Sequence, residues 1–241
     1  MPFTISHPAA VLPVLKNKNI NSTAVVIGSM APDFEYFIHF KPYQVYGHTV
    51  LGLMFYNLPL VLLVYIIIKL LIKQSLILNL PKLLVCRLYS NTVQTFKLSL
   101  RSTLIFIYSA LVGMLTHLIW DSFTHTSGVV VKWLGLNQII EFNTIKIPQY
   151  KLLQHGSSLI GFVIIVLYIF NLSEKEHLQR KSKREKTIYW FKVSLLSVSF
   201  MVIFILLIEN MTLGGYVVSL MNALFASIFV VSIFDKVINF L

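Results

Sequence analysis

Long, uninterrupted runs of apolar residues alternate along the chain with shorter polar connections. About 20 residues rising 1.5 Å each are needed to cross the 30 Å hydrocarbon core of a bilayer. Backbone groups in lipid must be hydrogen-bonded, and a helix achieves this within its own segment. The runs are continuously apolar, whereas barrel strands alternate apolar and polar residues. Helices are therefore predicted, and barrel strands are not. The pattern predicts an all-α, polytopic membrane bundle with five spans, at about 51–71, 103–123, 156–172, 188–208 and 215–234.

The first fifty residues are less apolar and are predicted to form short helices. Ser6 can cap a helix that has Pro8 in its first turn, and a second helix is expected from Ser22 to Met30, ended by Pro32. A charged segment followed by an apolar core, as in a cleavable signal peptide, is not found, so we expect the N-terminus to be retained. We divide the chain into an N-terminal helical region at 1–50, three spans at 51–172, a charged loop at 173–187 and two C-terminal spans at 188–241.

Composition supports the membrane assignment. Hydrophobic residues make up 56% of the 241 residues and charged residues only 12%, and the mean hydropathy is +0.77, whereas soluble domains carry about 25% charged residues. The net charge is +11. In a membrane protein such an excess sets topology and contacts anionic headgroups, so membrane lipid and not nucleic acid is the expected partner. The single cysteine, Cys86, excludes an internal disulfide and a Cys-based zinc site.

The basic residues indicate an orientation. If the five spans alternate in direction, most Lys and Arg residues fall on one side of the membrane, which the positive-inside rule assigns to the cytoplasm. The N-terminal region and the connection 124–155 are then extracytoplasmic. The basic residues on that side are Lys16, Lys18, Lys41, Lys132, Lys146 and Lys151.

Histidine and aspartate residues form the candidate site. His117, Asp121 and His125 are spaced by four, and each step of four turns only about 40° around a helix, so all three project from one face. Imidazole and carboxylate ligands suit zinc, with manganese or iron as alternatives. The full set of candidates lies on one predicted side of the membrane and comprises His7, Asp33, His48, His117, Asp121, His125 and His155.

Simpler roles exist for each of these residues taken alone. A single His or Asp near the end of a membrane helix is commonly a cap, an interfacial residue or a partner in a helix–helix hydrogen bond. Asp33 has the position of a cap for the helix after Pro32, and His48 precedes the first span, where it would meet the interface. The spacing of His117, Asp121 and His125 favours metal binding over these roles.

Several segments resemble known families. The opening MPFTISHPAAVLP, followed by VIGSMAPDFEYF, YGHT and GMLTHLIWDSFTH, resembles a bacterial membrane-protein family of unknown function over about the first 160 residues. More distantly, the order of ligands resembles that of membrane-bound metal-dependent hydrolases and of the zinc-dependent phospholipase C and P1 nuclease group. In that group an early His, an Asp and a His about fifteen residues apart, a His-x3-Asp pair and two further His bind a zinc cluster. The resemblance places these roles on the seven candidate residues.

The chain departs from that pattern at two ligands. The soluble enzymes have a Glu four residues after the last His, where this chain has Leu159, and they also use the amino group of a processed N-terminus. We therefore expect one well-formed site, made by Asp33, His48, His117 and Asp121. A weaker second position would involve His7, His125 or His155, which gives one or two zinc ions.

These observations predict a membrane-bound metal-dependent hydrolase that acts on a phosphoester, such as a phospholipid or lipid-linked phosphate, through metal-activated water. Asp33 or Asp121 would orient the water or accept its proton, with Glu35 as a lesser candidate. Two alternatives remain at this point. One is a non-catalytic protein in which the metal only ties helices together, and the other is a transporter with an ion path.

Overall fold

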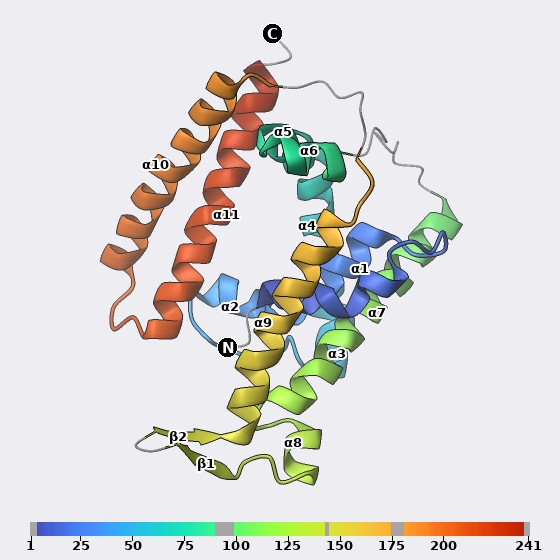
Figure 1. Ribbon diagram of the computed structural model, residues 1–241, viewed down its shortest axis with the longest axis vertical. Helices are drawn as coiled ribbons and strands as arrows, with labels where there is room; N and C mark the ends of the chain where they lie inside the picture. The colour runs from blue at the N-terminus through green and yellow to red at the C-terminus, as the bar shows by residue number, and fades with distance from the viewer. Residues whose placement is uncertain (1–3, 90–98, 143–144, 175–180, 239–241) are drawn as a thin grey trace. The chain divides into compact units, whose positions relative to one another are not determined.

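The structure is a computed structural model that describes residues 4–89, 99–142, 145–174 and 181–238 (Figure 1). Within these residues, five helical segments are long and apolar enough to cross a membrane. Each of them overlaps one of the five apolar runs, so the all-α, multi-pass architecture is confirmed. The segments are Val50–Asn79, Leu100–Trp133, Gln149–Phe170, Lys183–Leu207 and Leu213–Lys236.

The N-terminal region is helical, as predicted. Its short helices are η1 (Thr4–Val14), α1 (Ser22–Gly28), η2 (Ala31–Asp33) and α2 (Phe34–His39). The first span is α3 (Val50–Gly52), η3 (Leu53–Asn57), α4 (Leu58–Ile67), η4 (Ile68–Ile72) and α5 (Lys73–Asn79). The remaining elements are α6 (Lys82–Leu88), α7 (Leu100–Thr124), α8 (Val129–Trp133), β1 (Ile139–Phe142), β2 (Ile145–Pro148), α9 (Gln149–Phe170), α10 (Lys183–Leu207) and α11 (Leu213–Ile238).

The chain forms two compact units, each assembled from distant segments. Unit 1 contains residues 1–34, 45–62 and 97–168, and unit 2 contains residues 35–44, 63–96 and 169–241. The division made from the sequence follows the order of segments along the chain and stays a prediction.

Unit 1 is held together by a close contact between α1 and α7. A Cβ atom on Gly113 of α7 would lie only 2.2 Å from the carbonyl oxygen of Val25, and one on Gly28 of α1 would lie 2.4 Å from that of Ala110. Small residues let two helix backbones approach this closely. The contact fixes the end of α1, and the η2 turn that follows it, against the middle of α7.

The first span is not a regular α-helix. Its η3 and η4 segments are π-helical, with backbone bonds such as Leu58 N–H to the Leu53 carbonyl. Single π turns inside helices often occur at functional sites. In η3 the completely buried Asn57 donates through Nδ2 to the carbonyl of Gly47, 2.7 Å away. The span thereby holds the loop that precedes it.

The connection between α7 and α9 contains structure that the sequence analysis treated as a loop. After α8, strands β1 and β2 pair as an antiparallel hairpin in which Ile139 faces Pro148 and Glu141 faces Lys146. The backbone N–H of Gln149 donates to Gln138 and that of Tyr150 donates to Leu136. These bonds join the hairpin to the first turn of α9.

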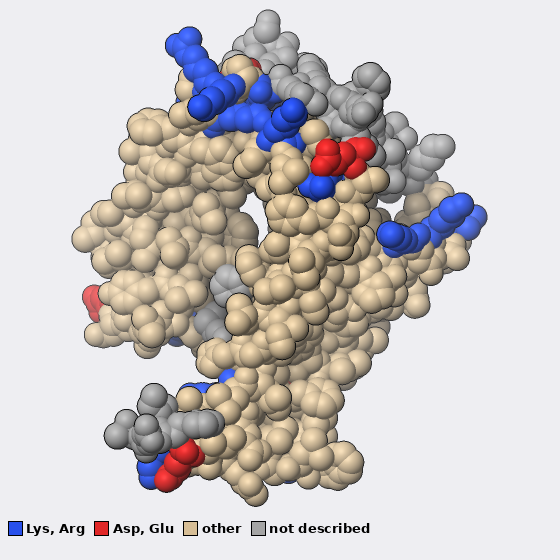
Figure 2. Space-filling model, viewed as in Figure 1, with Lys and Arg blue, Asp and Glu red and all other residues tan. Residues whose placement is uncertain are grey.

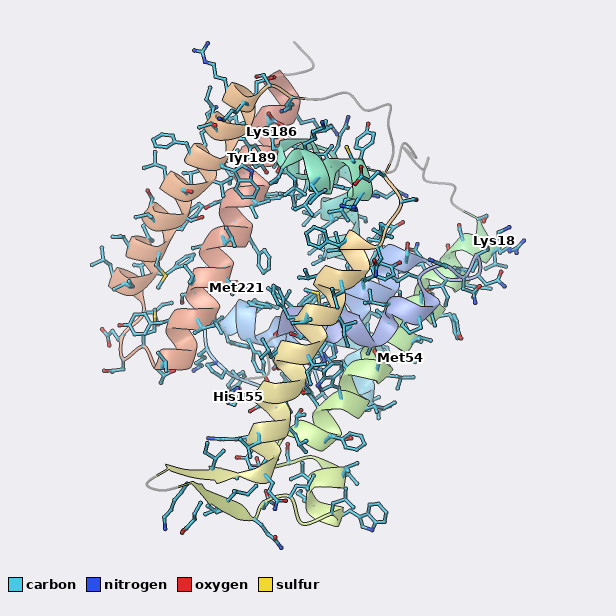
Figure 3. All side chains as sticks on the ribbon, in the orientation of Figure 1. Lys18, Met54, His155, Lys186, Tyr189 and Met221 are labelled. Atoms are coloured by element: carbon cyan, nitrogen blue, oxygen red, sulfur yellow. The ribbon has the colours of Figure 1, made fainter. Side chains whose placement is uncertain are left out.

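Unit 2 packs α10 against α11 around Tyr189, Val193 and Val231. The Tyr189 hydroxyl lies 2.9 Å from Ser232 Oγ, and Trp190 donates to the Asn79 carbonyl. Figure 3 labels Tyr189 and Lys186 on the first turns of α10, beside α5 and α6. Lys186 donates there to the Leu80 carbonyl at 2.6 Å.

A partly buried ion pair closes this end of unit 2. Asp235 of α11 accepts from Lys181, from Ser75 Oγ and, at 3.3 Å, from Asn79 Nδ2. The Asp235 side chain is only 20% exposed. Its partners satisfy the charge, which is the usual condition for a carboxylate to leave water.

Candidate metal centre

Four residues from three separate segments of unit 1 bring their ligand atoms together. One ligand atom from each lies within 4.8 Å of those of the other three, and the side chains are buried or, for His48, partly buried. Ligands about 2.0–2.1 Å from a tetrahedral zinc ion lie about 3.4 Å from one another. The measured distances from Nε2 of His117 are 3.6 Å to Asp33 Oδ1 and 3.3 Å to Asp121 Oδ2. The residues are Asp33, His48, His117 and Asp121.

Asp121 lies between two sets of imidazoles. Its Oδ2 is 3.2 Å from Nε2 of His48 and 3.3 Å from Nε2 of His117. Its Oδ1 is 3.4 Å from Nδ1 of His125 and 3.7 Å from Nε2 of His7. The two oxygens of one carboxylate therefore face different pairs of histidines, which is the arrangement of a bridging ligand.

The orientation of His117 is fixed by the contact between α1 and α7. Its Nδ1 lies 2.7 Å from the carbonyl oxygen of Ser29, which follows α1 directly. Because a carbonyl can only accept, Nδ1 carries a proton, and Nε2 is the ring nitrogen that faces the carboxylates. Histidines that bind metals commonly donate their other N–H to a carbonyl in this way. The small residues that bring α1 onto α7 thus also orient the ring of His117.

Asp33 is oriented by a neighbour from the start of the chain. Thr4 donates through Oγ1 to Asp33 Oδ2 at 2.6 Å, which leaves Oδ1 facing His117 and His48. Complete burial by itself raises the pKa of a carboxyl group, but the adjacent His117 imidazole more than offsets this, and the pKa of Asp33 lies below its usual value. Asp33 is therefore ionised at neutral pH, as a metal ligand must be.

His48 reaches the centre from the loop before the first span. Thr49 caps α3 by accepting from the N–H of Gly52, and Asn57 holds the carbonyl of Gly47. The residues on both sides of His48 are thus fixed by the first two turns of the span. The side chain of His48 is 22% exposed, so this edge of the centre is open.

His7 closes the centre on the side of η1. Its ring stacks on that of His117, with centroids 3.8 Å apart, and it is 2% exposed. Burial, together with the charge of His117, lowers the pKa of His7 to about 4. His7 is therefore neutral at pH 7, and within the described part of the chain neither of its ring nitrogens has a hydrogen-bond partner.

His125 is the last of the three spaced candidates and is the C-cap of α7. Nδ1 faces Asp121, and Nε2 lies 3.4 Å from Nε2 of Gln154, the buried residue in the first turns of α9. The structure therefore brings six of the seven predicted residues together. The Asp33, His48, His117 and Asp121 group is the tightest part, with His7 and His125 on the other oxygen of Asp121.

His155 is the candidate that does not join them. It lies on α9 next to Gln154 and is exposed to the surroundings (Figure 3). Gln154 and Ser158, four residues apart, occupy the buried face of α9 instead. The role of His155 as a ligand stays a prediction without geometric support. Glu35 is completely buried on α2 and belongs to unit 2, outside the group of four.

The buried polar atoms of the centre fit a cation. Among the residues that the structure describes, Asp33 Oδ1, Asp121 Oδ1 and His117 Nε2 are buried and make no hydrogen bond. A buried polar atom without a partner costs about 1–3 kcal/mol. Asp33 Oδ1 and His117 Nε2 face each other within the group of four, whereas Asp121 Oδ1 faces His7 and His125. A divalent ion would satisfy such donors without further hydrogen bonds. The group can therefore hold a metal ion.

Residues that support the ligands escaped the sequence analysis. Thr4, Ser29, Asn57 and Gln154 each orient a ligand, but none belongs to a motif with metal spacing. A weak signal existed for Asn57, because an amide inside an otherwise apolar span needs a partner. The role of Ser29 depends on its backbone carbonyl, which no side-chain pattern reveals.

Comparison with known proteins gives a family but no function. A family model described as "Domain of unknown function (DUF4184)" matches residues 1–233. Neither the curated proteins nor the solved structures provide a match. The resemblance to a family of unknown function is thereby confirmed, whereas the resemblance to hydrolases stays a prediction. Since the match spans nearly the whole chain, this protein belongs to the DUF4184 family.

Proposed function

We propose that this protein is a membrane-bound, zinc-dependent hydrolase that cleaves a phosphoester. The single observation that carries the proposal is the convergence of Asp33, His48, His117 and Asp121, with their ligand atoms within 4.8 Å of one another in a chain that has five candidate spans. Two imidazoles and two carboxylates are a donor set that suits zinc, with manganese or iron as the nearest competitors.

A catalytic metal site must be reachable, whereas a structural site is closed by its ligands. Two histidines at the edge, His48 and His125, are each 22% exposed, while Asp33 and His117 are completely buried. The centre is thus closed around Asp33 and His117 and partly exposed at His48 and at His125. This partial exposure favours a hydrolase over a metal that only ties helices together.

A bound divalent ion supplies two effects, since it lowers the pKa of a coordinated water towards 7 and polarises a phosphoryl oxygen. The side chains of the protein would supply the remaining functions, which are to orient the water and to accept its proton. Asp33, held by Thr4, and Asp121, facing both pairs of histidines, would orient a water or accept its proton. His7 and His125, on the Oδ1 side of Asp121, offer a second and weaker position for an ion.

The substrate and the location are part of the proposal. We propose an amphiphilic phosphoester, a phospholipid or lipid-linked phosphate, as the substrate, membrane lipid as the partner, and no contact with nucleic acid. The excess of Lys and Arg supports an extracytoplasmic site. Figure 2 shows the basic side chains of unit 2 gathered near α5, α6 and the start of α10, where Lys183 and Arg184 begin the helix and Lys181 precedes its N-cap.

The test begins with the metal content of the detergent-purified protein, measured by plasma mass spectrometry. We expect about one or two zinc ions per wild-type chain and loss of metal in His117→Ala, because a main ligand is removed. His155→Ala is the matched control, since this histidine lies outside the group.

The second step is hydrolysis of phosphoesters by the zinc-loaded protein, with His117→Ala as the blank. Full metal occupancy without hydrolysis of any phosphodiester or phosphomonoester would indicate that the metal site is structural and not catalytic. Absence of metal after incubation with zinc, manganese and iron would sink the proposal and favour an ion path or helix packing.

A further inference from the structure

The connection between α7 and α9 exposes apolar side chains where a loop in water would expose polar ones. Lys132 is the one Lys, Arg, Asp or Glu among residues 125–138. Trp133 is 81% exposed and Val129 is 76% exposed. Both lie in α8, beyond the C-cap of α7 at His125 and at the very end of the candidate span Leu100–Trp133.

The short helix α8 has a distinct inner and outer side. Val131 is completely buried, and Gly128, which precedes α8, fits so closely that a Cβ atom there would lie 2.3 Å from the carbonyl oxygen of Ser122 in α7. The opposite side carries Val129 and Trp133, four residues apart. We define the α8 face as the exposed side chains Val129, Trp133, Leu134 and Ile139.

The α8 face continues an exposed apolar surface on the candidate span α7. Exposed apolar residues recur every four positions along α7 at Leu115, Ile119 and Phe123, and they lead to the end where α8 begins. Beside the face, Lys132 in α8 and Lys151 in the first turn of α9 are exposed. In Figure 2 this lower end of unit 1 is mainly uncharged around α8, and the Glu141–Lys146 pair lies on the hairpin. A tryptophan among aliphatic side chains, flanked by lysines, suits the headgroup layer of a bilayer.

The α8 face is joined to the candidate metal centre by a short turn. The N–H of His125 donates to the Asp121 carbonyl, and the N–H of Gly128 donates to the His125 carbonyl at 2.8 Å. On the other side, the hairpin is bonded to the first turn of α9, and the second turn carries Gln154 beside His125. The open edge of the centre and the α8 face therefore belong to the same end of α7 and α9.

We propose that the α8 face lies in the headgroup layer of the bilayer that the helices cross, and that it presents the open edge of the centre to amphiphilic phosphoesters of that leaflet. This inference rests on the proposed hydrolase for its second part. It specifies that the substrate enters from the membrane plane and not from water.

The membrane contact is tested without any enzyme assay. The variant Trp120→Phe/Trp190→Phe keeps Trp133 as its one tryptophan. In vesicles of phosphatidylglycerol and phosphatidylcholine, we expect its fluorescence to be quenched by lipids brominated near the headgroup end of the acyl chain, and less by lipids brominated near the chain end. If that variant does not fold, the difference between wild type and Trp133→Phe gives the same quantity. Quenching no stronger than that of free tryptophan would overturn the proposal.

The route of the substrate is tested with two substrates. In Val129→Ser/Trp133→Ser/Leu134→Ser we expect hydrolysis of a phospholipid in vesicles to fall about tenfold or more, because apolar contact with the leaflet is lost. Hydrolysis of water-soluble bis(p-nitrophenyl) phosphate should stay within about twofold, since no ligand is changed. Glu141→Gln/Lys146→Gln on the hairpin is the matched control and should change neither.

The two proposals fail in different ways. An equal loss on both substrates, with unchanged zinc content, would overturn the route through the α8 face while leaving a hydrolase. A wild type that hydrolyses neither substrate would remove the hydrolase, and the second part of the inference with it. The quenching result then decides the membrane contact alone.

Discussion

Unit 1 and unit 2 each bury carboxylates, but the groups around them differ in kind. In unit 2, Asp235 accepts from the Lys181 ammonium, a serine hydroxyl and an asparagine amide. In unit 1, Asp33 and Asp121 face mainly imidazoles, and one oxygen of each makes no hydrogen bond within the described residues. The first cluster contains its own cation, the Lys181 ammonium, whereas the second is a set of donors that could hold a metal ion.

The difference separates a structural ion pair from a binding site. A buried carboxylate that is paired and hydrogen-bonded has little left to offer a ligand. Imidazoles that are neutral can bind a metal without first losing a proton, and His7 is kept neutral by burial. Metal binding should therefore depend on unit 1 alone, and removal of the unit 2 ion pair should affect stability alone.

The largest effect is expected from Asp121→Asn, because the amide offers one neutral oxygen in place of two charged ones that face four histidines. We expect zinc affinity to fall by more than about a hundredfold. Isothermal titration of the metal-free protein in detergent measures it. Affinity within a few-fold of wild type would show that Asp121 is not a ligand.

The same variant separates metal binding from folding. A ligand at a hundred times its Kd adds about 2.7 kcal/mol of stability to the folded state. Zinc should therefore raise the Tm of the wild type, whereas the Tm of Asp121→Asn should not respond.

A smaller effect is expected from Thr4→Val, which keeps the size of the side chain but removes the hydroxyl that orients Asp33. Loss of a hydrogen bond to a metal ligand typically weakens metal binding about 10–100-fold. Zinc affinity of this variant, measured beside Thr4→Ser, checks the role. Thr4→Ser retains a donor and should bind within a few-fold of wild type, and equal losses in both variants would point to packing instead.

Asp235→Asn in unit 2 should act on stability and not on metal. It leaves the Lys181 ammonium, only 11% exposed, without its anion. We expect a loss of about 1–3 kcal/mol and a lower Tm, with the zinc-induced rise in Tm unchanged. Thermal unfolding with and without zinc measures both quantities. A reduced zinc response would contradict the separation of the two clusters.

The smallest effect is expected from His155→Ala, with His125→Ala as its partner. His155 is exposed on α9, whereas His125 faces both Asp121 and Gln154. Zinc stoichiometry should be unchanged in His155→Ala, and in His125→Ala the weaker second ion should be lost. Loss of metal in His155→Ala would restore the assignment made from the resemblance.

Sequence periodicity was sufficient where a property repeats along one segment. The five apolar runs identified the five candidate spans, and the spacing of four placed His117 and Asp121 on one side of α7. His125 reaches Asp121 as the extended C-cap beyond the helix. Both results follow from local geometry, because backbone groups in lipid must bond within their own helix and residues four apart share a face. The hairpin and the π turns were not predicted, since short strands and single extra residues in a helix leave little periodic signal.

The candidate site required the tertiary structure. The sequence supplied seven residues of the right chemistry, and the fold selected among them, bringing Asp33 and His48 to α7 while leaving His155 exposed. Exposure of His155 follows from the rotation of α9, whose buried face carries Gln154 and Ser158. Ser29 and Thr4 became visible only through contacts across the chain. The sequence by itself determined the helices, because these depend on neighbours along the chain. It also determined the donor types, because these are the residue identities themselves. Which donors share a centre depends on how the helices pack, through close contacts such as those at Gly28 and Gly113. Only the tertiary structure decided this packing.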